Sequence, residues 1–148
     1  FEDNFTLQLD LITYGNTGPN LEELPLAVCE LISVKQLLLS FNQLKSLPAE
    51  MVNLTRLKKL MLIFNQFVEF PAVLCELAGL EVLGMVGNQL STLPPTMVKM
   101  LSLRTITLTR NRFNYVPLVL GQLSQLQELF IGGEFLIVLY CYWRLVSS

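Results

Sequence analysis

Histidine is absent from this 148-residue sequence. Its absence removes the commonest general base of enzymes and the commonest metal ligand of proteins. The sequence also has no C-x-x-C pair, no G-x-x-x-x-G-K phosphate loop and no G-x-S-x-G nucleophile motif. Carboxylates such as Glu22, Glu23 and Glu50 have no partner placed to share a proton. We therefore do not expect an enzyme, and we predict neither a cofactor nor a bound metal.

A strong charge of either sign is also missing, because the formal net charge is −2. This value argues against a dedicated nucleic-acid binder. The charges are unevenly spread: residues 1–30 carry six carboxylates and no Lys or Arg, whereas nine of the ten basic residues fall between Lys35 and Arg112. The sequence therefore predicts an acidic N-terminal end and a basic middle.

Long hydrophobic runs are few, although 52% of the residues are hydrophobic and the mean hydropathy is +0.51. The apolar run near the C-terminus has about a dozen residues, too short for the roughly 20 that cross a bilayer. No signal peptide is recognisable, and the sequence begins at Phe1 instead of Met. We expect no membrane span in this segment, and the start at Phe1 is consistent with a fragment.

What the sequence does contain is a repeat of 23 residues. Its pattern is L-x-x-L-x-L-x-x-N-x-L-x-x-L-P, and it occurs over residues 34–48, 57–71, 80–94 and 103–117. One repeat buries too few apolar side chains to offset the conformational entropy lost on folding. Stability must therefore come from contacts between neighbouring repeats.

This period and pattern resemble the leucine-rich repeat, which has one strand and one helical or irregular segment per turn. The resemblance implies an α/β fold: a leucine-rich repeat solenoid with a curved parallel sheet on the concave side and short helices or 3₁₀ turns on the convex side. We predict a single domain over residues 1–148. Residues 1–33 would form a degenerate N-terminal cap and partial repeat, 34–125 four regular repeats, and 126–148 a degenerate C-terminal repeat.

Two features of the ends are predicted in more detail. Residues 5–11 alternate between apolar and polar side chains, which indicates a first strand, and a turn-rich loop follows at residues 14–20. In the C-terminal repeat, Glu134 replaces the asparagine of the pattern, and polar spacing is then lost. For residues 135–148 a buried cap, a dimer contact and a truncation product are all left open.

The asparagine of each repeat stands where the chain must leave the strand. Its side-chain amide can satisfy backbone groups that neighbouring repeats leave unpaired. We predict a buried structural ladder and no catalytic role for these residues: Asn42, Asn65, Asn88 and Asn111. The proline that follows should start each convex turn, because its missing N–H is tolerated there.

The variable positions between the leucines should face outward on the sheet. Several of them are apolar although the packing of the repeat does not require it, namely Leu38, Phe41, Met61, Ile63, Phe64, Val82 and Val86. A basic strip is expected beside them, from Lys35, Lys58, Lys59, Arg104, Arg110 and Arg112. An apolar patch with a charged rim is typical of a protein-binding surface. The predicted site comprises Leu38, Phe41, Lys59, Met61, Ile63, Phe64, Val82, Val86, Arg110 and Arg112; alternatively, the acidic N-terminal segment or a neighbouring domain covers the patch.

The L-P-x-x-L step, as in residues 47–51, is similar to the Ras-group intracellular leucine-rich repeats of scribble, erbin and Ras suppressor. This resemblance implies a cytoplasmic signalling scaffold or adaptor whose concave face binds a protein, often a small GTPase or a phosphatase. Cys29 and Cys75 occupy the same repeat position two repeats apart, about 10 Å from each other and beyond disulfide reach. Unpaired cysteines favour a reducing compartment.

Two sequons, Asn4-Phe5-Thr6 and Asn53-Leu54-Thr55, point instead to glycosylation. An extracellular or cell-surface recognition ectodomain therefore stays open as an alternative. A purely structural segment of a longer solenoid is a third interpretation. The sequence does not determine the oligomeric state.

Overall fold

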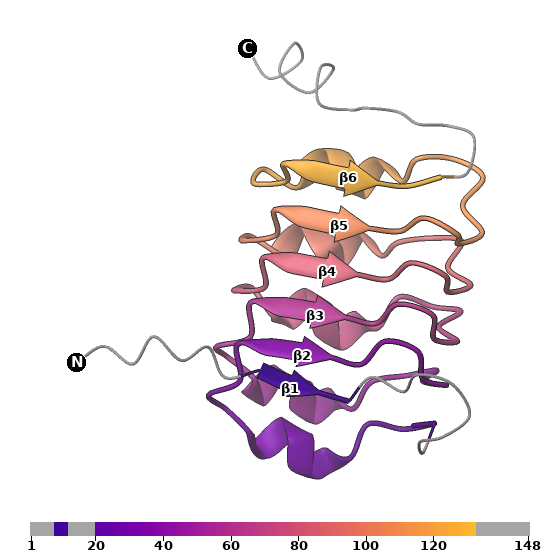
Figure 1. The fold of residues 1–148 in the computed structure, drawn as a ribbon. Coiled ribbons are helices and arrows are strands. Elements are labelled where there is room, and N and C mark those ends of the chain that lie inside the picture. Colours follow the sequence, from indigo (N-terminus) through magenta and orange to yellow (C-terminus); the bar gives the residue numbers. More distant parts are fainter. Residues whose placement is uncertain (1–7, 12–19, 133–148) are drawn as a thin grey trace.

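Each lap of 23 residues forms one three-residue strand and one five-residue 3₁₀ turn in the computed structural model, which describes residues 8–11 and 20–132. The strands are β1 (Gln8–Asp10), β2 (Gln36–Leu38), β3 (Lys59–Met61), β4 (Val82–Gly84), β5 (Thr105–Thr107) and β6 (Glu128–Phe130). The turns are η2 (Leu26–Glu30), η3 (Ala49–Asn53), η4 (Ala72–Glu76), η5 (Pro95–Lys99) and η6 (Leu118–Gln122). Figure 1 shows the strands stacked in one layer with the turns behind them.

The strands form one parallel sheet in the order β1-β2-β3-β4-β5-β6. Each residue of β2 pairs with the residue 23 positions later, so that Leu37 lies beside Leu60, and Leu60 beside Leu83. These central leucines are fully buried, while the flanking residues of each strand are largely half-buried. The predicted fold class, a leucine-rich repeat solenoid with a parallel sheet on one side and 3₁₀ turns on the other, is confirmed.

The core lies between the sheet and the turns. Each turn has a proline as its N-cap residue, for example Pro48 before η3 with a φ of −68°. The residue after the turn closes it by donating its backbone N–H to a carbonyl three residues back, as Leu54 does to Met51 at 3.0 Å. Both side chains point inward and are no more than 1% exposed. The prediction that the prolines start the convex turns is confirmed, with the proline one position before the turn.

The four asparagines hold neighbouring laps together at the point where the chain leaves each strand. Asn88 shows the pattern: its Oδ1 accepts a hydrogen bond from the N–H of Phe67 at 3.1 Å, and its Nδ2 donates to the carbonyl oxygen of Leu62 at 2.9 Å. Nδ2 also donates to Met85 of its own lap at 3.0 Å. Equivalent bonds between laps are made by Asn42, Asn65 and Asn111.

The two ends differ in how much is described. Of the predicted first strand only β1 and Leu11 are described, and Leu24 packs in the core as part of the first partial repeat. At the other end, Leu126, Leu129 and Ile131 are only partly buried. Residues 1–7, 12–19 and 133–148 lie outside the described residues, and with them most of the predicted loop, Asn4, Cys141, Glu134 and the C-terminal segment. The predicted domain boundaries remain predictions.

Candidate functional site

The outward side chains of the sheet form a surface that we call the strand face, made by the first and third residues of each strand and the residues at the second and third positions after it. The register places Leu38, Met61, Gly84, Thr107 and Phe130 in one column of this face. Lys59 and Val82 are neighbours in a second column. The structure thus brings the apolar residues singled out in the sequence together on one side of the sheet.

The exposure of these apolar residues is unequal. Phe41 and Phe64 are 41% and 37% exposed, whereas the others are half-buried, namely Leu38, Met61, Ile63, Val82 and Val86. Met61 is half-buried partly because its side chain leans across a glycine of the next lap. A Cβ atom on Gly84 would lie 2.6 Å from Cε of Met61, so the Met61 side chain fills the space that Gly84 leaves free. The two phenylalanines are therefore the most accessible apolar groups of the patch.

Phe41 and Phe64 have an unusual backbone conformation. Both precede a ladder asparagine, and their φ angles are 60° and 52°. Gly87 and Arg110 occupy the same position in the next two laps with φ angles of 69° and 56°. We call these four residues the left-handed column. This conformation costs an L-residue about 1–2 kcal/mol, and for a bulky residue it is rare.

The side chains of the left-handed column contact one another along the solenoid. The ring centroids of Phe41 and Phe64 are 5.2 Å apart with 32° between the ring planes. The ring of Phe64 leans over Gly87, where a Cβ atom would lie 2.5 Å from its Cε1 atom. Cζ of Arg110 lies 5.8 Å from the centre of the same ring. Sequence reasoning found these residues but missed the backbone conformation, for which Gly87 was the only signal.

Substituting Gly87 by alanine tests this arrangement. The new Cβ atom would occupy the place of the Phe64 ring, and the alanine would have to keep the left-handed backbone of Gly87. We therefore expect the free energy of unfolding to fall by about 1–2 kcal/mol. Gly79→Ala is the matched control, because the nearest heavy atoms to its Cβ would be 3.8 Å away and its φ is not positive. Urea denaturation followed by circular dichroism measures both; equal effects of the two substitutions would contradict the arrangement.

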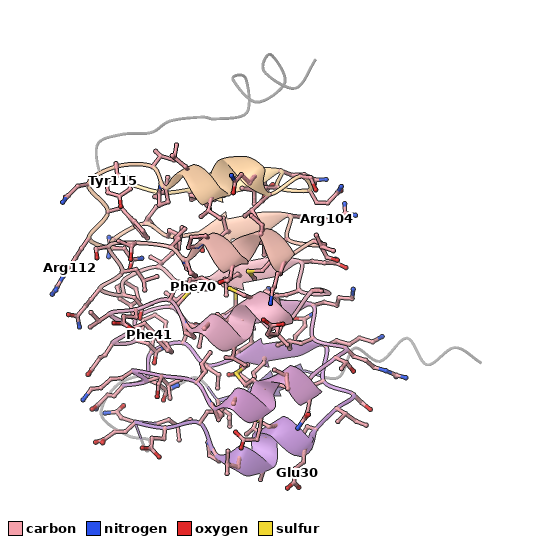
Figure 2. All side chains as sticks on the ribbon, turned by 180° about the vertical axis from the view of Figure 1, so that it is seen from behind. Glu30, Phe41, Phe70, Arg104, Arg112 and Tyr115 are labelled. Atoms are coloured by element: carbon pink, nitrogen blue, oxygen red, sulfur yellow. The ribbon has the colours of Figure 1, made fainter. Side chains whose placement is uncertain are left out.

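The basic residues do not form one strip, and this part of the sequence prediction is wrong. Lys35, Lys58 and Arg104 lie just before β2, β3 and β5, whereas Arg110 and Arg112 follow β5. Figure 2 shows Arg104 and Arg112 on opposite sides of the stack. The first group is also interrupted, because Nζ of Lys58 forms an ion pair with Oε1 of Glu81 at 2.9 Å. Arg110 lies beside the ring of Phe64, Arg112 follows it two residues later, and Lys59 lies within β3.

The acidic residues of the first partial repeat, Glu22, Glu23 and Glu30, do not cover the patch. Leu21 continues the repeat at the first end of the stack, where its N–H donates to Oδ1 of Asn42 at 3.0 Å. Glu22, Glu23 and Glu30 are exposed at this end, and Figure 2 shows Glu30 at the bottom of the stack. No acidic side chain of residues 20–30 therefore covers the patch, whereas Asp10 of β1 lies beside Leu38 in the register of the sheet.

Comparisons with known proteins agree with this architecture. Residues 32–90 match the family described as "Leucine rich repeat". Over these residues the chain is similar to leucine-rich repeat proteins, and it shares their solenoid fold. Among solved structures, it is similar to a leucine-rich repeat protein of Leptospira interrogans, with 35% identity and a TM-score of 0.70 over 75% of this chain and 28% of that chain. A comparison with curated proteins gave no match.

Two further solved structures show the same repeats in other settings. The leucine-rich repeat ectodomain of the Arabidopsis thaliana membrane receptor kinase GASSHO1/SCHENGEN3, in complex with CASPARIAN STRIP INTEGRITY FACTOR 2, is 31% identical with a TM-score of 0.64, over 74% of this chain and 14% of that chain. An internalin of Listeria monocytogenes is 20% identical with a TM-score of 0.65, over 80% and 36%, and shows the fold alone. This chain thus spans well under half the length of these leucine-rich repeat proteins.

Other chemistry in the leucine-rich repeat domain is limited. Cys29 and Cys75 are buried and free of disulfides, and burial raises the pKa of both thiols above the ordinary value. A thiol with a raised pKa is a poor nucleophile at neutral pH. In the part of the chain that the structure describes, no three His, Cys, Asp or Glu side chains are grouped to hold a metal, and no helix could span a membrane.

Proposed function

We propose that this leucine-rich repeat domain binds a protein partner on its strand face and serves as an intracellular signalling scaffold or adaptor. Leucine-rich repeat domains are generally protein interaction modules. The observation that carries the proposal for this chain is the exposed pair Phe41 and Phe64, held in a left-handed backbone. The site would comprise these rings with Leu38, Lys59, Met61, Ile63, Val82, Val86, Arg110 and Arg112.

The core does not need the two rings. Beneath them, Leu39 and Leu62 are already fully buried, and Gly87 adopts the same backbone without any side chain and without strain. Aromatic side chains are the commonest anchors of protein interfaces. Exposed and stacked phenylalanines that the core does not need therefore fit a binding role better than a structural one.

The intracellular part of the proposal depends on the resemblance and on the cysteines. Unpaired Cys29 and Cys75 favour a reducing compartment, and the L-P-x-x-L step is similar to Ras-group repeats, for which a small GTPase or a phosphatase would be the partner. A cell-surface recognition domain is the second candidate, because Asn53 and Thr55 of one sequon are both exposed. Intact-mass analysis of the natural protein separates them: a glycan on Asn53 would favour the cell surface.

The double variant Phe41→Asn/Phe64→Asn tests the binding face. Asparagine tolerates positive φ, so the backbone should be retained while both anchors are removed. We expect recovery of specific partners from a cytosolic lysate to fall at least about tenfold, because truncating a hot-spot aromatic costs about 2 kcal/mol or more. Quantitative mass spectrometry of the recovered proteins measures this loss.

The control removes exposed apolar area from the opposite side of the domain. Leu101 and Leu118 are 64% and 89% exposed and lie on or near the 3₁₀ turns. The variant Leu101→Asn/Leu118→Asn should recover the partners as the native domain does. Partner recovery that survived loss of both phenylalanines, with circular dichroism showing a folded domain, would exclude the strand face as the binding site.

A further inference from the structure

We infer that the partner segment bound by the strand face carries a carboxylate side chain next to an apolar side chain, with the carboxylate placed on Arg110 and Arg112. This inference rests on the proposed function and adds the chemistry of the partner. The apolar side chain would contact the rings of Phe41 and Phe64.

The first argument is that the rings and a guanidinium form one continuous surface. Phe64 and Arg110 belong to laps two apart, whose strands lie about 10 Å from each other. They nevertheless come within 5.8 Å, from Cζ to the ring centre, because the ring leans over Gly87. A guanidinium that stacks on a ring keeps its N–H edge available for a carboxylate. An apolar contact and an ionic contact are therefore offered side by side.

The second argument is that these two cations have no acidic partner among residues 8–11 and 20–132. The ion pairs found there are Lys58 with Glu81 and Lys99 with Glu76, and Arg110 and Arg112 belong to neither. Both arginines are exposed. Arginine binds carboxylates through paired, charge-assisted hydrogen bonds. A carboxylate of the partner would accept hydrogen bonds from guanidinium N–H groups that have no acidic partner in this part of the chain.

The third argument is the distribution of charge along the same side of the stack. The asparagine ladder makes Leu21 equivalent to Leu44, Phe67 and Leu90, because each donates its N–H to the asparagine of the next lap. Glu22 and Glu23 therefore lie on the same side of the sheet as Arg112, but at the opposite end of the stack. An acidic group on the partner is attracted to one end and repelled from the other.

A nucleic acid fits these observations less well than a protein segment. Nucleic-acid binding requires a continuous basic surface. Here the cations lie at opposite ends of the strands, and Glu81 pairs with Lys58 in the group that precedes the strands. The net charge of −2 also disfavours a polyanion. Phosphate groups would contact the arginines and leave the phenylalanine rings unused, whereas a peptide with an acidic and an apolar side chain would contact both.

The test is a selection of random 12-residue peptides displayed on phage, with the full 148-residue chain as bait. Three further baits are used: Phe41→Asn/Phe64→Asn, Arg110→Gln/Arg112→Gln, and Lys35→Gln/Arg104→Gln. The last variant also removes two positive charges, but from residues that precede the strands instead of following them. We expect the native chain and the Lys35/Arg104 variant to enrich peptides with Asp or Glu beside an apolar residue. The Arg110/Arg112 variant should enrich apolar peptides without the acid.

The strongest selected peptide is then compared with its Asp→Asn or Glu→Gln form by fluorescence polarisation. We expect the neutral form to bind the native chain about tenfold more weakly, as two exposed charge-assisted contacts would predict, and to bind the Arg110/Arg112 variant as the acidic form does. The tenfold difference should shrink in high salt, because salt screens exposed charges.

Several outcomes would overturn the inference. Equal binding of the acidic and neutral peptides to the native chain would remove the carboxylate and leave the proposed function intact. Peptides that bind the Phe41/Phe64 variant as well as the native chain would instead overturn the proposed function. Self-association in analytical ultracentrifugation that the Phe41/Phe64 variant abolishes would place a second copy on the face. Displacement of the peptide by a single-stranded RNA oligonucleotide would assign the arginines to phosphate.

Discussion

Replacing Asn88 with alanine is expected to lower the free energy of unfolding by about 3 kcal/mol, because buried backbone groups that lose a hydrogen-bond partner cost about 1–3 kcal/mol each. The N–H of Phe67 and the carbonyl oxygen of Leu62 would both lose the bonds that they make to the Asn88 amide at 3.1 and 2.9 Å. No water can replace the amide easily, since Asn88 is 6% exposed. Chemical denaturation followed by circular dichroism measures the loss.

Gln89→Ala is the matched control for this prediction. Gln89 is the next residue in the chain, and its side chain is half-exposed. Its backbone N–H donates to the carbonyl oxygen of Phe67 at 2.8 Å, a bond that alanine retains. The substitution should therefore change stability by no more than about 0.5 kcal/mol. A loss at Asn88 no larger than the loss at Gln89 would show that the ladder contributes little to stability.

The repeat period predicted the buried half of the structure well, because that half depends only on residues at equivalent positions. Leu37, Leu60 and Leu83 pair in register because each lap has the same length. The prolines predicted the turns for a similar reason, since proline fixes φ and lacks an N–H. Such features depend on one residue and its own lap, and a sequence pattern contains that information.

The exposed half was harder to predict, because it depends on the size of the neighbour in the next lap. Met61 and Phe64 each lean over a glycine of the next lap, and the pattern treats Gly84 and Gly87 as ordinary variable positions. The positive φ of Phe41 and Phe64 could not be predicted from the residue type, because phenylalanine rarely adopts it. The strip of cations failed for a different reason: Lys58 precedes its strand, β3, whereas Arg110 follows its strand, β5, a distinction that the sequence position already contained.

The left-handed column links these two halves. Its backbone is set by the ladder, because each residue directly precedes an asparagine whose amide is fixed by two laps. Its side chains are not used by the core. The conformation is the same in the four laps where this position is described, and the sequence decides whether an aromatic ring, a hydrogen atom or a guanidinium is displayed there. This division explains how a stable solenoid can carry a specific surface.

The strongest test of the stacked core compares two leucines that differ in burial. Leu83 in β4 is 0% exposed, whereas Leu118 in η6 is 89% exposed. Leu83→Ala should lower the free energy of unfolding by about 3–5 kcal/mol, through lost burial and the cavity left behind. Leu118→Ala removes the same atoms and should change stability by no more than about 0.5 kcal/mol. Thermal and urea denaturation of both variants measure the contrast.

The position of Leu83 adds a second expected result. In a repeat protein each lap contacts mainly its neighbours, so a cavity in β4 weakens the contacts of β4 with both β3 and β5. Hydrogen exchange should then show loss of amide protection in β3, β4 and β5 before the outer laps lose theirs. The native chain should lose protection from its ends inward, because terminal laps have one neighbour. If Leu83→Ala left protection highest in the middle of the stack, the laps would be coupled more widely than nearest-neighbour contacts allow.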